Sequence, residues 1–189
     1  MHPLTAHIRR FVPLSDAEAS RVTESLETVA LKKKAYLLEP GLPCRANHFI
    51  LKGCFRLYMV DESGTEQTVQ FGIENWWITD YAAFESNRAA TFYLQATEAS
   101  EAVLLRKGVQ ETLLGEIPSL ERYFRLIVQR AYAASLNRIQ YLFSLSGEER
   151  YRHMNNAFPE FVRRVPQYML ASYLGFTPEF LSKIRAKNG

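Results

Sequence analysis

The stretch that most constrains the fold is residues 166–186, where apolar residues recur at the offsets of two short helices joined by a tight turn. Leu170, Ala171 and Leu174 share one face of the first helix. Gly175 follows where that helix should end, in the left-handed conformation that glycine adopts without strain. A second helical pattern begins directly afterwards, so this stretch predicts a helix-turn-helix.

The second helix of this pair has a start signal and two distinct faces. Thr177 is a typical N-cap, and Pro178 suits the first helical position, where no backbone N–H is required. Leu181 and Ile184 should face the first helix, with Phe176 as an apolar plug between the two. The outer face then carries Pro178, Glu179, Ser182, Lys183 and Arg185. An ordinary αα-hairpin would fit any one of these features, but all of them together favour a DNA-binding motif.

The excess positive charge of the chain lies in the same region. The 189 residues carry a net charge of +3, and residues 146–189 hold seven basic and four acidic residues, which account for all of that excess. A phosphate backbone attracts such a surface, although a solvated basic segment would produce the same count. Arg163 and Arg164, just before the motif, are candidates for phosphate contacts.

Composition and cysteine usage exclude several classes of protein. A hydrophobic content of 47% supports a packed core and argues against disorder. Cys44 and Cys54 are the only cysteines, which excludes a structural zinc site and a four-cysteine iron–sulfur cluster and leaves a bridge between them open. The sequence shows neither a signal core nor an apolar run of membrane-spanning length, so we predict a cytoplasmic location.

Between about residues 28 and 107 the sequence has the texture of β-structure. Short apolar runs alternate with turn residues at close intervals, as in a β-sandwich or barrel. Residues 55–60 lead into the turn Asp61–Gly64, and residues 66–71 form the expected partner strand of a hairpin. A capping box at Ser15–Glu18 predicts a helix before this region.

A long helix is predicted from Pro118 to about Leu145, with two apolar stripes. One stripe comprises Leu120, Phe124, Ile127, Ala131 and Ala134, and the other comprises Tyr123, Val128, Tyr132, Leu136, Ile139 and Phe143. Two stripes suit two partners, the β-region and the same helix of a second copy, whereas burial within one subunit is the alternative. We favour a homodimer through residues 118–145, because a single helix-turn-helix reads too few base pairs for useful specificity.

The next helix begins at a second capping box, Ser146–Glu149, which we take as a domain boundary. The predicted organisation is a β-roll effector-type domain with flanking helices at residues 1–116 and a dimerisation helix at 117–145. A helix-turn-helix domain follows at 146–189. The fold class is therefore α+β, with an N-terminal antiparallel β-roll, a long helix and a C-terminal helix-turn-helix.

This order of elements resembles the Crp/Fnr family of bacterial transcription regulators. The resemblance covers nearly the whole chain and is carried by Phe49–Arg56 with the turn Glu62–Gly64, by Gly147–Arg152 and by Ala171–Arg185. It implies a cyclic-nucleotide-binding β-roll and a recognition helix, Thr177–Ala186, in the major groove. It also implies a non-enzyme whose partners are double-stranded DNA, a second copy, a small-molecule effector and, as a further candidate, RNA polymerase, with no membrane.

The expected effector pocket departs from the family pattern. Nucleotide-binding members use a Gly-Glu pair for the ribose and an Arg-Ser/Thr pair for the cyclic phosphate. The corresponding positions here are Thr79-Asp80 and Ala90-Thr91. Asp80 and Thr91 remain candidate ligands, and Arg88 is the candidate substitute for the absent arginine. Because a buried phosphate needs a charge-assisted partner, no cofactor is expected and classical cyclic AMP binding is unlikely to occur.

Two rival functions follow from the same sequence. A cupin-type enzyme would need two or three histidines on neighbouring strands, and His48 alone lies in the β-region. A ligand-sensing or protein-interaction module with a degenerate helix-turn-helix is the stronger rival. The sequence stops just after the recognition helix, so a DNA-contacting wing should lie within about 158–166 or be missing, which keeps that rival open.

Overall fold

The structure, a computed structural model, describes residues 1–188. The chain divides into two compact units, and each is described by itself. The first contains residues 1–58 and 71–130, and the second contains residues 59–70 together with the described chain from Ala131 onward. The division between the units falls between Arg130 and Ala131, within the long helix. The sequence placed the domain boundary at 145–147, where one helix stops and the next begins.

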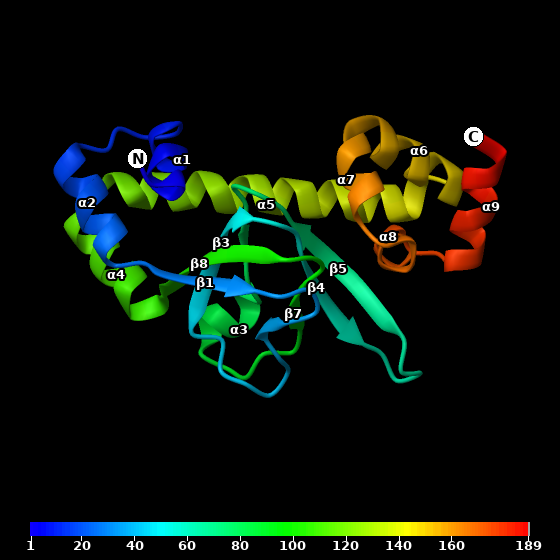
Figure 1. Cartoon of the computed structure of the whole chain (residues 1–189), viewed down its shortest axis with the longest axis horizontal. Helices are drawn as coiled ribbons and strands as arrows, with labels where there is room; N and C mark the ends of the chain where they lie inside the picture. Colours follow the sequence, from blue (N-terminus) through cyan, green and yellow to red (C-terminus); the bar gives the residue numbers. More distant parts are fainter. Residues whose placement is uncertain (189) are drawn as a thin grey trace. The chain divides into compact units, whose positions relative to one another are not determined.

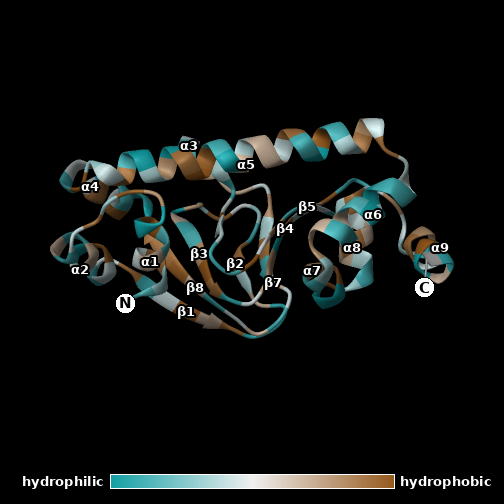
Figure 2. Ribbon diagram, turned by 90° about the horizontal axis from the view of Figure 1, so that it is seen from above, coloured by the Kyte–Doolittle hydropathy of each residue, from teal (hydrophilic) through white to brown (hydrophobic). Residues whose placement is uncertain are grey.

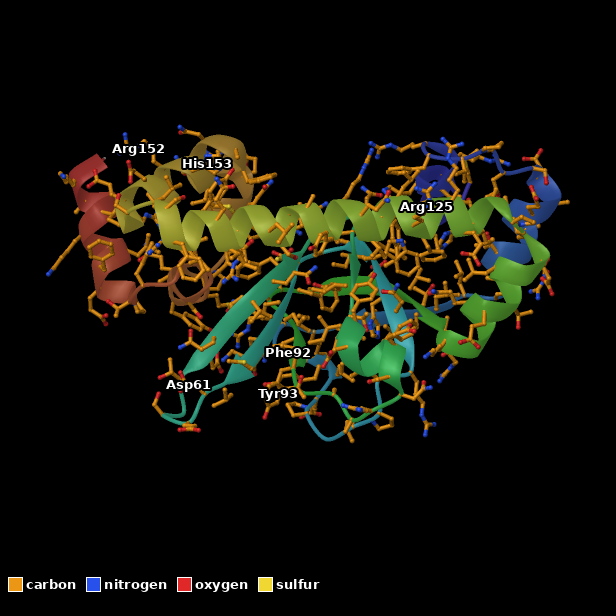
Figure 3. The ribbon with its side chains drawn as sticks, turned by 180° about the vertical axis from the view of Figure 1, so that it is seen from behind. Asp61, Phe92, Tyr93, Arg125, Arg152 and His153 are labelled. Atoms are coloured by element: carbon orange, nitrogen blue, oxygen red, sulfur yellow. The ribbon has the colours of Figure 1, made fainter. Side chains whose placement is uncertain are left out.

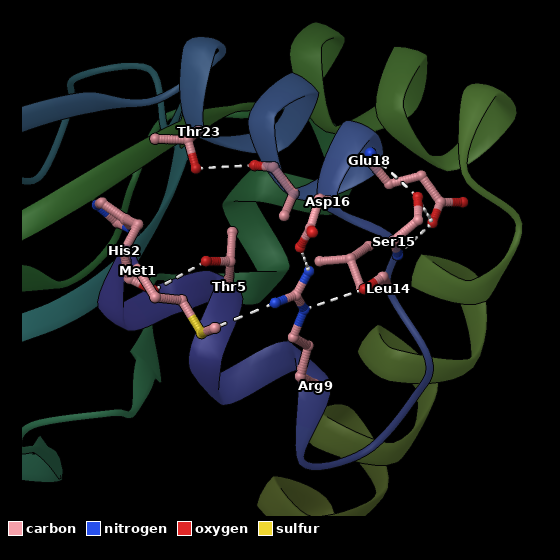
Figure 4. A network of polar contacts seen from close by, with 10 residues as sticks. Met1, His2, Thr5, Arg9, Leu14, Ser15, Asp16, Glu18 and Thr23 are labelled. Carbon is pink, nitrogen blue, oxygen red and sulfur yellow. Dashed lines mark hydrogen bonds and ion pairs between the residues drawn. The ribbon is translucent and has the colours of Figure 1, made fainter.

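Two helices open the first unit: α1 (Pro3–Arg9) and α2 (Asp16–Glu24). The predicted capping box is confirmed, because the Ser15 hydroxyl accepts from the backbone of Glu18 while the Glu18 carboxylate accepts from that of Ser15. Arg9 fixes the corner between the helices (Figure 4), with Nε donating to the Leu14 carbonyl at 3.0 Å and Nη2 contacting Asp16 at 2.6 Å.

Within the described residues, eight short strands form the β-roll that the sequence predicts (Figure 1). The strands are β1 (Glu27–Leu31), β2 (Tyr36–Leu38), β3 (Ala46–Lys52), β4 (Phe55–Val60), β5 (Glu66–Gly72), β6 (Trp77–Ile78), β7 (Tyr93–Ala96) and β8 (Ser100–Arg106). They make two four-stranded sheets, in the orders β1-β8-β3-β6 and β2-β7-β4-β5. Helix α3 (Tyr81–Ser86) lies between β6 and β7, and α4 (Lys107–Glu116) follows β8.

The core of the first unit joins β-strands to helices. Phe49, Val103 and Leu105 from the strands are fully or almost fully buried, and they belong to one cluster with Leu120 and Tyr123 of the long helix. Burial of such side chains stabilises the fold by about 1.5–3 kcal/mol each. Cys44 and Cys54 are both buried as thiols, so the disulfide left open by the sequence does not form.

Helix α5 (Ser119–Ser144) is the predicted long helix and passes from the first unit into the second. Hydrophobic and hydrophilic residues alternate along it (Figure 2). Leu120 and Tyr123 are buried, whereas the stripe from Val128 onward is exposed. Tyr123, which the sequence analysis grouped with that stripe, belongs to the core.

The second unit contains α6 (Gly147–Ala157), α7 (Pro159–Arg164), α8 (Gln167–Leu174) and α9 (Pro178–Asn188). The capping box that opens α6 is confirmed, with Ser146 and Glu149 exchanging hydrogen bonds. Within residues 158–166, the one place left for a wing before the motif, Pro159–Arg164 form α7, with Pro159 in its first turn. Of the two alternatives that the sequence left open, a wing within this segment is therefore not the one that the structure shows. Among the described residues, no helix is long and apolar enough to cross a membrane.

Candidate nucleic-acid interface

Helices α8 and α9 are joined by the predicted glycine turn. Gly175 has φ +77°, which lies in the left-handed region. The Phe176 N–H donates to the Ala171 carbonyl at 3.1 Å, as in a Schellman motif, and so satisfies a carbonyl at the end of α8. A side chain at position 175 would also approach Leu142, since an added Cβ would lie 2.9 Å from its Cδ2. Gly175 therefore serves both the turn and its packing on α5.

The faces of the two helices match the sequence prediction. Leu170, Ala171 and Leu174 of α8 are buried, as are Leu181 and Ile184 of α9. Phe176 is half-buried, and its ring packs edge-on against Phe180, with 5.3 Å between centroids. The outer residues Pro178, Glu179, Ser182, Lys183 and Arg185 are all exposed. This is the geometry of a helix held by its apolar face with a polar face free.

The start of α9 brings Thr177 and Glu179 together. The Thr177 hydroxyl accepts from the Phe180 N–H at 3.3 Å, as expected of an N-cap. The pKa of Glu179 is lowered by hydrogen bonds, first from its own backbone N–H and then from the Thr177 side chain. The carboxylate is thus ionised and lies at the positive end of the helix dipole.

Further basic side chains are exposed on the other helices of the second unit. Arg163 and Arg164 are exposed in the last turn of α7, and Arg163 is ion-paired with Glu160. Arg152 and His153 are exposed on α6 (Figure 3). Lys187 of α9 contacts Glu148 of α6 at 3.2 Å.

Arg150 is a positioning residue that the sequence analysis did not single out. Its Nη1 donates to the carbonyls of Leu142 and Leu145, at 3.0 and 3.1 Å, and its guanidinium lies 5.7 Å from the Phe176 ring centroid. It therefore satisfies carbonyls at the end of α5 while contacting the turn of the motif. The sequence gives one signal for this contact. Arg150 is a basic residue in the first turn of α6, and α6 directly follows the end of α5.

In the first unit, the structure brings Asp80 and Thr91 together. The Asp80 side chain is 1% exposed and caps α3, with Oδ1 accepting from the Ala83 N–H at 3.1 Å. Its Oδ2 accepts from both the backbone N–H and the hydroxyl of Thr91, at 3.0 and 3.2 Å. Ala90 is buried and Arg88 is exposed. The donors of Thr91 are therefore already engaged by an anionic side chain.

Hydrogen bonds from Lys107 hold the C-terminal end of α3. Lys107 Nζ donates to the carbonyls of Phe84 and Glu85, at 3.0 and 2.8 Å, and lies 3.3 Å from Asn87 Oδ1. Two open depressions occur elsewhere on this unit. One, of about 270 Å³, is lined by Arg21, Ser25, Gly108, Val109 and Thr112, and the other, of about 130 Å³, is lined by Ala30, Leu31, Lys52, Ala99, Ser100 and Glu101. Neither includes a residue of the Asp80–Thr91 pair.

Comparisons with known proteins agree with this architecture. A family model described as "Cyclic nucleotide-binding domain" matches residues 28–116. Among curated proteins, the transcriptional regulatory protein btr of Bordetella pertussis is 25% identical over 174 residues, covering 86% of this chain and 71% of that protein. These two matches, together with the fold of a solved structure described as a putative Crp/Fnr regulator from Eubacterium rectale, agree with the resemblance to the Crp/Fnr family.

Several solved structures share the fold of this chain at low sequence identity. FixK2 from Bradyrhizobium japonicum has a TM-score of 0.72 at 16% identity, over 86% of this chain and 83% of its own. CLP, the c-di-GMP responsive global regulator of Xanthomonas campestris, has a TM-score of 0.74 at 14% identity, over 92% and 91%. The arrangement of an antiparallel β-roll followed by a C-terminal helix-turn-helix is thus a fold that these solved structures share.

Proposed function

We propose that the protein is a dimeric, sequence-specific DNA-binding transcription regulator. The observation that carries this proposal is the outer face of α9, which is exposed and polar while its inner face is buried against α8. Such a helix fits the major groove, whose base edges it meets with side chains near its N-terminus. The relative btr is described as a transcriptional regulatory protein, which supports the same assignment.

The residues of this face differ in the contacts they suit. Glu179 accepts from a cytosine amino group, and Lys183 donates to guanine O6 or N7, with Ser182 between them on the same face. Thr177 and Pro178 start the helix and reach the groove with it. Arg185, Arg163 and Arg164 are assigned to phosphates, which position the protein without reading sequence.

The exposed stripe of α5 supports a homodimer through residues 118–145. Its apolar side chains recur in steps of three and four, and they range from 46% exposed at Leu136 to 89% at Phe143. The set comprises Val128, Tyr132, Leu136, Ile139 and Phe143. A contiguous apolar face of this kind suits the same face of a second copy, as in a coiled coil. The division into a β-roll, a dimerisation helix and a DNA-binding domain follows from this assignment.

The effector is assigned to a class other than classical cyclic AMP. A cyclic phosphate would bring a negative charge to Asp80, whose carboxylate already engages both donors of Thr91. Ala90 offers no cation there, so the residues present do not fit the phosphate. CLP is described as responsive to c-di-GMP, which makes that dinucleotide a test ligand for this chain. RNA polymerase is proposed as a partner if the protein activates transcription, and DNA binding would place it in the cytoplasm.

Selection of genomic fragments by the purified protein tests this function. The wild-type protein should recover fragments with a common motif at 50–100 mM salt, a range in which phosphate contacts are still strong. Arg185→Ala should weaken binding to all sequences alike and reduce the salt slope by about one ion. Recovery of random fragments, or no retention at this salt with and without nucleotides, would contradict the proposal.

A further inference from the structure

The β4–β5 hairpin (residues 59–70) belongs to the same compact unit as the helix-turn-helix. Strand β5 is an edge strand of the sheet β2-β7-β4-β5, so one side of its backbone lacks a neighbouring strand. On α8, Ser172 substitutes for that neighbour. Its Oγ donates to the Glu66 carbonyl at 2.8 Å and accepts from the Thr68 N–H at 2.8 Å. One hydroxyl therefore satisfies two backbone groups of an edge strand.

Arg138 of α5 reinforces the same contact from a second helix. Its Nη2 donates to the Thr68 carbonyl at 3.3 Å and to the Tyr173 carbonyl at 2.9 Å. Its guanidinium lies 4.5 Å from the centroid of the Tyr173 ring, a cation–π geometry. Arg138 is half-buried, and this burial lowers the pKa of its guanidinium. The hairpin, α5 and α8 thus meet at Thr68.

The hairpin is ordered by its own contacts. Asp61 Oδ1 accepts from the backbone N–H groups of Ser63 and Thr65, at 2.9 and 3.0 Å, and Oδ2 accepts from Gln67 Nε2 at 2.9 Å. These bonds lower the pKa of Asp61 to about 2, with the Ser63 hydroxyl as the largest cause. A carboxylate so bonded stiffens the turn, and a stiff hairpin is able to hold a helix in place.

We infer that the hairpin is a positioning element of the DNA-binding unit, which it joins through Ser172 and Arg138. It contacts Ser172 and Tyr173 of α8, while Glu179, Ser182, Lys183 and Arg185 of α9 stay exposed. The contact therefore leaves the outer face of α9 free and fixes the helix on which α9 packs. This inference rests on the proposed DNA-binding function.

Two polar atoms at this contact lack a hydrogen-bond partner among the described residues, and one of them offers a test of the inference. Thr68 Oγ1 and Arg138 Nε are buried without a hydrogen-bond partner among the described residues. A buried donor or acceptor without a hydrogen-bond partner loses its hydration without compensation, and this destabilises the contact. Thr68→Val removes the hydroxyl, keeps the branched shape and leaves the backbone groups that Ser172 and Arg138 bind. It should strengthen the docking of the hairpin, whereas Ser172→Ala should weaken it.

The experiment compares these two variants with wild type and with Ser86→Ala. Ser86 is an exposed residue of α3, outside the proposed dimer helix, whose hydroxyl donates within its own helix, to Ala82. Affinity is measured for a selected site and for random DNA at fixed salt. Ser172→Ala should lower specific affinity by about threefold to tenfold, the effect of about one net hydrogen bond, with random-DNA affinity unchanged. Thr68→Val should equal or exceed wild type, and Ser86→Ala should match it.

Hydrogen exchange without DNA separates this inference from the proposed function. Ser172→Ala should accelerate exchange in residues 59–70 and in α8 and α9 together, and Thr68→Val should slow both. If wild type ignores DNA but this coupling appears, the proposed function fails and the contact stands. Acceleration confined to the hairpin, unchanged specific affinity in Ser172→Ala, or a gain in its affinity would overturn the inference.

Discussion

At the scale of single residues, a mutation distinguishes two roles proposed for Glu179, a base reader and a helix-end charge. Glu179 lies at the N-terminus of α9, where its pKa is lowered by hydrogen bonds, and it is exposed on the proposed reading face. A charge at a helix start contributes only a few tenths of a kcal/mol to stability. Base reading contributes about 1–3 kcal/mol of discrimination at one position. The two roles therefore predict different binding-site motifs.

We predict that Glu179→Ala relaxes base preference at one position of each half-site, with little change in the midpoint of thermal unfolding. Glu179→Gln is the matched variant, because an amide pairs with adenine and should move the preference there instead of abolishing it. Selection from a random library with each protein measures both effects. An unchanged motif in both variants would leave Glu179 as a helix-end charge.

Asp80 illustrates what a sequence shows about a residue and what it does not. Its position and that of Thr91 were predicted from spacing, and the structure brings them within hydrogen-bond distance. That the two residues bind one another was not predictable, because they are eleven positions apart and a short helix lies between them. Side-chain pairing across a loop depends on packing that no local pattern encodes.

At the scale of elements, local signals predicted more than long-range ones. The two capping boxes and the glycine turn involve neighbouring residues, so Ser15, Ser146 and Gly175 indicated their helix ends correctly. The hydrogen bonds between Ser172 and β5 join residues that are 104 and 106 positions apart, and no pattern in the sequence predicted them. The sequence left open whether residues 158–166 hold a wing, although the fixed φ of Pro159 favours the helix that begins there.

The exposed stripe of α5 carries the prediction that belongs to this scale. We expect Leu136→Glu to convert a wild-type dimer into a monomer, because burying two like charges near the axis of a helix pair is costly. Analytical ultracentrifugation at micromolar concentration measures the change. Glu121→Gln, on the first turn of the same helix and outside the stripe, is the control and should stay dimeric. A monomeric wild type would contradict the assignment of this face.

At the scale of the whole molecule, two buried histidines predict how stability depends on pH. His7 Nδ1 lies 2.8 Å from the Tyr123 hydroxyl, which also accepts from Trp77 Nε1 at 2.8 Å. His48 Nδ1 lies 3.2 Å from the Ile78 carbonyl. Burial lowers the pKa of each imidazole to about 4, and Arg10 and Arg130 contribute at His7. Both rings are therefore neutral in the folded protein near neutral pH.

The unfolded chain binds more protons than the folded one between pH 4 and about 6.5, the unperturbed histidine value. The free energy of unfolding should therefore fall as the pH is lowered through that window, by at most about 1.4 kcal/mol per pH unit for each histidine. Denaturant titrations between pH 7 and pH 4.5 measure the slope. Because a glutamine side chain does not titrate, His7→Gln should roughly halve the slope of the unfolding free energy against pH. A slope equal to that of wild type would show that His7 does not contribute to it.

The final prediction concerns the dimer on DNA. If two copies pair through α5, their recognition helices read two half-sites about 10–10.5 base pairs apart, centre to centre, on one face of the duplex. Inserting about five base pairs, half a helical turn, between the half-sites should reduce wild-type affinity toward that of a single half-site. Replacing the same central bases without changing their number is the matched control. The Leu136→Glu protein should bind the original and lengthened sites equally weakly. Wild-type affinity that ignores the insertion would contradict a two-fold complex, because the second recognition helix would then contribute nothing to binding.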